Sequence, residues 1–194
     1  MTIVRACLLA VAGLMLATTA GSQTVLDTLF DKLRTATDPS AVQALEEGIW
    51  EQWTMLPKPE HRRLMLQGIS EMQQQELQQA VVTFTKLIEV APELSEAWNK
   101  RATVYWLLGN FPASINDICE TVKREPRHFG AYSGLGMIRA QMGEHARAAA
   151  AFELAKKWNP HIVGIDAEIE RQKAEAGNEV SDDPLGCGQR TAGR

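Results

Sequence analysis

Four histidines are the first candidates for catalysis or metal binding: His61, His128, His145 and His161. None has a second histidine at the spacing that would place two imidazoles on one face of a helix, and none stands in a metalloprotease motif. The sequence also contains no glycine-rich phosphate loop and no nucleophile elbow. We therefore expect no enzymatic activity, with no catalytic residues, no metal ligands and no cofactor.

Two short segments concentrate charged and amide side chains, Glu96–Thr103 and Arg124–Ala131. Each stands where a helix is expected to begin, and basic side chains near a helix N-terminus suit a carboxylate or phosphate group. A polar patch for a small anionic ligand would contain Asn99, Lys100, Arg101, Arg127 and His128. The alternative is a solvated helix junction with local ion pairs to Glu96 and Glu125, which we favour because surface ion pairs alone say little about function.

The charge of the chain narrows the choice of partners. The 194 residues carry a formal net charge of −4, and the isoelectric point is about 5.6. Nucleic-acid-binding proteins usually present a basic face instead. No long block of like charges would support a purely electrostatic partner either. We expect an unidentified protein or peptide partner and no nucleic acid.

A repeated pattern organises the elements that would carry a binding site. Proline recurs every 34 residues, at Pro92, Pro126 and Pro160. Bulky, small and apolar positions keep the same spacing: Leu64, Trp98 and Tyr132; Gly68, Ala102 and Gly136; Ala80, Ser114 and Ala148; Phe84, Ile118 and Phe152; and the turn glycines Gly109 and Gly143. Small residues let two helices approach closely and proline ends a helix, so the pattern predicts antiparallel helix pairs.

This pattern resembles the tetratricopeptide repeat, with repeats at residues 61–94, 95–128 and 129–162. The resemblance implies an all-α fold, a right-handed superhelix of antiparallel helix pairs, that binds a protein or peptide in its concave groove. The segments EAWNKRA and EPRHFGA, at residues 96–102 and 125–131, also resemble those of exported bacterial tetratricopeptide-repeat proteins.

The flanks of the repeats have weaker patterns. Residues 23–60 are expected to form a degenerate helical pair with a connector that caps the N-terminal end, with Asp38 and Pro39 starting its second helix. Residues 163–177 are expected to form a C-terminal capping helix, because stacked repeats need a polar outer face. Residues 178–194 are small, polar and glycine-containing, which is typical of a disordered tail.

By register, the first helix of each repeat lines the groove. The predicted partner-binding residues are Met65, Ile69, Met72, Asn99, Thr103, Trp106, Ser133 and Met137. Methionine adapts to different shapes, and tryptophan often dominates binding energy. The alternative is that these side chains pack against neighbouring repeats, which is as plausible for the methionines as groove binding and less so for Trp106.

One version of this repeat binds the C-terminal carboxylate of heat-shock chaperones through a clamp of lysine, asparagine and arginine. The corresponding positions of this chain are Met65, Ile69, Lys100, Gly130 and Gly134. Only Lys100 has a suitable side chain. We therefore do not expect this chain to bind chaperone tails.

The N-terminal residues 1–22 have the layout of a secretory signal peptide: a basic start, an apolar middle and small residues at the end. Cleavage is expected after Ala20 or Ser22. The apolar run is shorter than the ~20 residues of a membrane-spanning helix, so we expect no stable membrane span after cleavage. A retained anchor is the alternative, which would make the chain a membrane-anchored assembly factor. The expected location is the periplasm, and the expected role is a scaffold in bacterial envelope assembly or maintenance.

Export leaves two cysteines, Cys119 and Cys187, in the mature chain. A disulfide between them is possible in an oxidising compartment. They lie far apart in the sequence, however, and we favour a core residue at Cys119 and a free tail thiol at Cys187.

Overall fold

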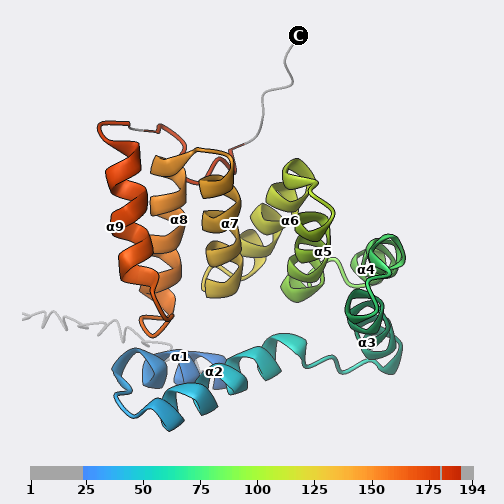
Figure 1. The fold of residues 1–194 in the computed structure, drawn as a ribbon. Helices are drawn as coiled ribbons and strands as arrows, with labels where there is room; N and C mark the ends of the chain where they lie inside the picture. The colour runs from blue at the N-terminus through green and yellow to red at the C-terminus, as the bar shows by residue number, and fades with distance from the viewer. Residues whose placement is uncertain (1–23, 180, 189–194) are drawn as a thin grey trace, which may run out of the picture.

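The computed structural model describes residues 24–179 and 181–188, and within these ranges the chain forms nine α-helices and no strand (Figure 1). The first four are α1 (Val25–Thr35), α2 (Pro39–Thr54), α3 (Pro59–Gln73) and α4 (Leu77–Val90). The next five are α5 (Ser95–Leu107), α6 (Phe111–Arg124), α7 (Phe129–Gln141), α8 (His145–Trp158) and α9 (Ile165–Ala176). The predicted all-α fold is confirmed, whereas the expected signal peptide at residues 1–22 lies outside the described residues.

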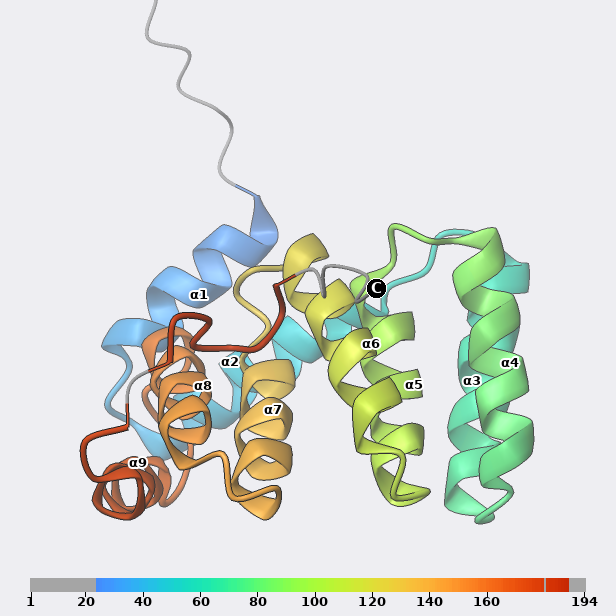
Figure 2. The same ribbon diagram turned by 90° about the horizontal axis from the view of Figure 1, so that it is seen from above.

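Three antiparallel pairs stand side by side in the order α3–α4, α5–α6 and α7–α8 (Figure 2). The small residues allow the close approach within a pair, because a Cβ added at Gly68 or Gly136 would lie 2.6 Å from the ring of Phe84 or Phe152. Gly109 and Gly143 end the first helices in the left-handed backbone region, with φ of 71° and 73°. The spacing of the pattern therefore accounts for the packing within the pairs and for the turns of the second and third pairs, whereas Gln75, with φ of 63°, takes the corresponding position in the first.

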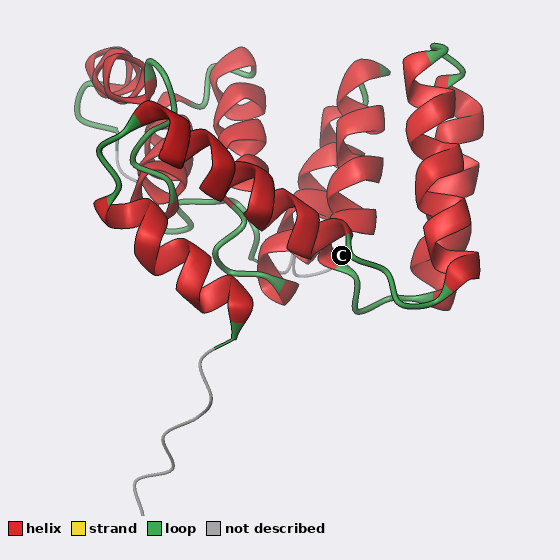
Figure 3. Cartoon of the chain, turned by 90° about the horizontal axis from the view of Figure 1, so that it is seen from below, coloured by secondary structure: helices red, strands yellow, loops and turns green. Residues whose placement is uncertain are grey.

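The N-terminal helices α1 and α2 do not cap the α3–α4 end of the stack, so that prediction was wrong. They lie across the lower ends of the repeat helices, and Figure 3 views them from that side. Their buried residues Phe30, Leu33, Ile49 and Trp53 form one core with Phe129 at the start of α7. The predicted start of α2 is confirmed, because Asp38 accepts a hydrogen bond from the Ala41 N–H at 2.8 Å. The pair docks sideways because its apolar face finds aromatic partners there.

At the other end, α9 packs on α8 through Ile165 and Ile169. The chain then turns back, and residues 181–188 lie against the second and third repeats. Cys187 forms a disulfide with Cys119, with Cα atoms 5.5 Å apart. The predictions of a free thiol and of a disordered tail were therefore wrong for this segment. The sequence did not predict this disulfide, because the two cysteines are 68 residues apart and no pattern relates their positions.

None of the helices in the described part of the chain is long and apolar enough to cross a membrane.

Candidate functional site

A cavity of about 230 Å³ opens between α5 and α7, the first helices of the second and third repeats. Helix α5 contributes Asn99, Thr103 and Trp106, and helix α7 contributes Met137. All four are predicted groove residues. Trp106 and Met137 remain 38% and 50% exposed, so they present apolar surface that the fold leaves uncovered. The structure thus brings together the central part of the predicted groove.

A second cavity, of about 900 Å³, continues along α7 towards α9. Met137 lines both cavities, and the predicted residue Ser133 lines the second. The far wall includes Ile165, Arg171 and Gln172 from α9. Because the two cavities adjoin at Met137, we treat them as one groove along α5, α7 and α9.

The first repeat does not contribute the groove residues expected of it. Met65 is only 2% exposed and belongs to the core of α3 and α4, so its assignment to the groove was wrong. Ile69 and Met72 are half-buried and pack against the same core. None of the three lines the cavity between α5 and α7. The packing alternative holds for both methionines of α3.

Trp50 of α2 is a wall of the cavity that the repeat register did not assign to the groove. Its ring reaches the backbone of α7 because residue 130 is glycine: a Cβ there would lie 2.6 Å from Trp50 Cη2. Gly134, one turn later, also lines the cavity, and a Cβ there would meet only the Ile118 side chain, at 3.8 Å. Two glycines on one helix face were the only sequence signal that another segment approaches α7.

Behind the cavity lies a buried polar cluster centred on Glu96. The Glu96 carboxylate is fully buried, accepts hydrogen bonds from Asn99 at 3.0 Å and His128 at 2.8 Å, and pairs with Lys100 at 2.9 Å. Burial by itself would raise the pKa of Glu96, but the hydrogen bond from His128 and the charge of Lys100 outweigh it, so the pKa lies below its usual value of 4.5.

His128 links this cluster to the N-terminal pair. Its Nδ1 accepts a hydrogen bond from the Ala131 N–H at 3.1 Å, so Nε2 carries the proton that is donated to Glu96. The ring stacks on Trp53, with centroids 4.0 Å apart and planes 9° from parallel. His128 therefore caps α7, holds Glu96 and supports α2 at once.

The predicted anion patch is not an open site. His128 is buried, and Arg127 pairs with Asp27 at 2.6 Å and Glu125 at 3.0 Å. Arg101 points to the other side of α5 and binds Asp117 with two hydrogen bonds, of 2.7 and 2.8 Å. Lys100 and Arg127 pair with Glu96 and Glu125, as the favoured interpretation expected, and the alternative of an anion-binding patch does not hold because internal carboxylates already neutralise these side chains. Among the described residues, no three His, Cys, Asp or Glu side chains form a group that could hold a metal ion.

Comparisons with known proteins agree with this geometry. Tetratricopeptide-repeat family profiles match residues 65–122 and 129–162. A TPR repeat-containing protein of Rhizobium etli is 30% identical over 128 residues, which cover 66% of this chain and 63% of that protein. The matched part thus spans less than two thirds of that relative.

Solved structures share the fold at low sequence identity. The TPR2B domain of yeast Sti1, in its complex with pHsp70, has a TM-score of 0.56 and 20% identity, covering 61% of this chain and 99% of that chain. The MamA protein has a TM-score of 0.57 and 18% identity, covering 80% of this chain and 82% of that chain. The family profiles cover most of the three helix pairs, and the solved structures share their fold.

Proposed function

Because this chain is a tetratricopeptide-repeat protein, we propose that it binds a segment of a partner protein in the groove along α5, α7 and α9. The observation that carries the proposal is the cavity between α5 and α7, where Trp106 and Met137 leave apolar surface uncovered. Partly exposed tryptophan beside a preformed pocket is the usual composition of a binding hot spot.

The lining indicates the chemistry of the ligand. Trp50, Trp106 and Met137 offer apolar walls, and the missing side chains of Gly130 and Gly134 leave room beside the α7 backbone. Such a pocket suits one large apolar side chain of a peptide, with Thr103 and Asn99 near its backbone. Lys100, the one residue that fits the chaperone clamp, is held by Glu96 and lies 5.6 Å from the Trp50 ring. The chaperone peptide bound by yeast Sti1 is therefore not the ligand proposed for this chain.

A peptide library displayed on phage, selected against the folded chain, tests the proposal. We expect enrichment of peptides with a large apolar residue. For synthetic versions of these peptides, the dissociation constant of Trp106→Glu should exceed that of wild type by about tenfold or more, because the substitution places a charge in the cavity.

Leu107→Glu is the matched control, because Leu107 is an exposed apolar residue of the same helix that does not line the cavity. It should bind the peptides as wild type does. Equal binding by wild type and Trp106→Glu would contradict the proposed site.

We also propose that the chain is exported and acts as a scaffold in the bacterial envelope. The signal-peptide pattern of residues 1–22 supports export, and a disulfide fits an oxidising compartment. Intact-mass measurement of the native protein tests this: a mature chain starting near Gly21 or Gln23 supports export with cleavage. A chain that keeps Met1 contradicts cleavage and favours the membrane-anchored alternative.

A further inference from the structure

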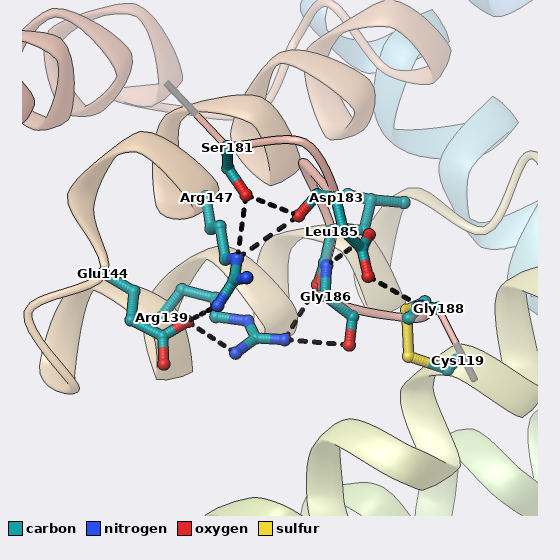
Figure 4. A network of polar contacts seen from close by, with 10 residues as sticks. Cys119, Arg139, Glu144, Arg147, Ser181, Asp183, Leu185, Gly186 and Gly188 are labelled. Carbon is teal, nitrogen blue, oxygen red and sulfur yellow. Dashed lines mark hydrogen bonds and ion pairs between the residues drawn. A yellow bond between two sulfur atoms is a disulfide. The ribbon is translucent and has the colours of Figure 1, made fainter. Parts of the chain in front are cut away.

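The segment of residues 181–188 has no helix or strand, yet it lies in an ordered path over α7 and α8 (Figure 4). We call it the strap. It occupies a groove on the opposite side of the repeats from the binding site described above. No residue lines both this groove and either inner-face cavity. The strap therefore marks a separate surface.

Two arginines of the repeats hold the backbone of the strap. Arg139 is buried, and its Nη2 donates to the carbonyl oxygens of Leu185 at 2.9 Å and Gly186 at 3.2 Å. Arg147 Nε donates to the Asp183 carbonyl oxygen at 3.2 Å (Figure 4). Both guanidinium groups also bind Glu144, which fixes their positions. Hydrogen bonds to main-chain carbonyls would hold any segment that follows the same path.

Leu185 supplies the apolar contact. Its side chain packs against the cores of both the second and the third repeat, so it fills the seam between them. Beside the strap lies a cavity of about 630 Å³, lined by Pro112, Ile115 and Met142 of the repeats and by Asp183 and Gly186 of the strap itself.

The shape of the strap depends on one tight turn. The Asp183 carboxylate accepts hydrogen bonds from the N–H groups of Gly186 and Gly188, each at 2.8 Å. These hydrogen bonds, the one from Gly188 first, lower the pKa of Asp183. Gly186 has a φ of 65°, and a Cβ there would lie 2.0 Å from Arg139 Nη2. A side chain at residue 186 would be strained by this positive φ and would have to displace the Arg139 guanidinium, so the turn favours glycine.

We propose that this outer groove is a second peptide-binding site, which the chain's own strap fills and the Cys119–Cys187 disulfide keeps closed. Its external ligand is a protein segment with the chemistry of the strap: an aspartate turn, then leucine, then glycine. Buried Arg139, the seam that Leu185 fills and the adjacent cavity together offer hydrogen-bond donors and apolar surface to an extended segment. A tethered strap has a high effective concentration, so an external segment enters only when the strap is displaced.

The test uses the full chain with two substitutions. Cys187→Ser removes the disulfide with Cys119, and Gly186→Ala places a Cβ against the Arg139 guanidinium. The probe is a labelled synthetic peptide that copies residues 179–188 with serine at the cysteine position. Fluorescence anisotropy should give a dissociation constant for this variant that is lower than that of the oxidised wild type by about tenfold or more. A probe with aspartate at the leucine position should not bind. Equal binding to both proteins, or no binding to the variant, would overturn the proposal.

Hydrogen exchange measured by NMR separates a displaced strap from an unfolded chain. The amides of residues 186 and 188 should exchange faster in the double variant than in wild type, while α6, α7 and α8 keep their protection. If the helices lose protection too, the strap is part of the core and the proposal fails. Gly109→Ala is the control, because Gly109 also has a positive φ but faces open space. This variant should leave the strap protected and the probe unbound.

Discussion

The N-terminal pair α1–α2 and the strap are both attached to the second and third repeats, but by different means. The pair buries an aromatic core around Trp53 and Phe129 and stacks on His128, which binds the buried Glu96. The strap buries mainly Leu185 and depends on arginine–carbonyl hydrogen bonds and a disulfide. One attachment is part of the core, whereas the other is a removable segment with a covalent lock.

The difference shows how a segment without secondary structure can stay ordered. Ordering each residue of a chain costs about 1–2 kcal/mol of backbone entropy. The helices of the pair offset this cost by burying large side chains, whereas the strap has one leucine to bury. A disulfide that closes a long loop lowers the conformational entropy of the unfolded chain. For the 68-residue separation seen here, this destabilises the unfolded state by a free energy of about 4 kcal/mol. The disulfide therefore supplies stabilisation that the strap does not obtain from burying apolar side chains.

The largest effect is expected where the N-terminal pair meets the repeats. Glu96→Ala removes the acceptor of His128 and Asn99 and the charge that holds Lys100, all inside the fold. Urea denaturation should show a loss of about 3–5 kcal/mol in the free energy of unfolding. Glu93→Ala, at an exposed position in the loop three residues before Glu96, should change it by less than about 0.5 kcal/mol. A small loss for Glu96→Ala would mean that this attachment is no firmer than the strap.

Removing the Cys119–Cys187 disulfide should lower the free energy of unfolding by less than Glu96→Ala does. The double substitution Cys119→Ser and Cys187→Ser should lower the free energy of unfolding by about 2–4 kcal/mol. Circular dichroism should show the same helix content as wild type, because the strap has no helix to lose. A loss of helix content would show that the disulfide supports the repeats themselves, and would remove the contrast between the two attachments.

Two glycines of α7 sharpen the comparison at the N-terminal pair. Gly130→Ala places a Cβ 2.6 Å from the Trp50 ring, so α2 must shift, and we expect a loss of about 1–3 kcal/mol. Gly134→Ala meets only Ile118, at ordinary contact distance, and should gain up to about 1 kcal/mol of helix propensity. Thermal unfolding of both variants measures the difference. Equal melting temperatures would show that Trp50 is not tightly held.

The smallest effect concerns pH. Hydrogen bonds from Thr24, and then from Arg127, lower the pKa of Asp27 from 3.8 to about 2. Between these values the unfolded chain binds more protons than the folded chain, so the contribution of Asp27 is complete above pH 4 and is lost as the pH falls towards 2. The melting temperatures of wild type and Asp27→Asn should therefore differ above pH 4 and converge below it. A difference that persists at pH 2 would contradict the assignment.

Much of the inner groove could be predicted from the sequence. The repeat register places Thr103, Trp106 and Met137 on first helices, and the structure puts all three around one cavity. The register failed for Met65, because a first-helix position lines the groove only where the helices beside it leave space, and the α3–α4 core closes over it. The favoured interpretation of the polar segments, local ion pairs, did not include the contacts of Arg127 with Asp27 and of His128 with Glu96, because these partners lie on other helices.

The sequence by itself determined the helix pairs, because prolines, turn glycines and small residues act within one repeat through short-range sterics. It also determined which face of α5 and α7 carries apolar side chains. Only the tertiary structure decided where α1–α2 docks, that Trp50 becomes a groove wall, and that Cys187 returns to Cys119. These contacts join segments that no periodic pattern relates, since they depend on how whole surfaces fit together and not on the spacing of residues along the chain.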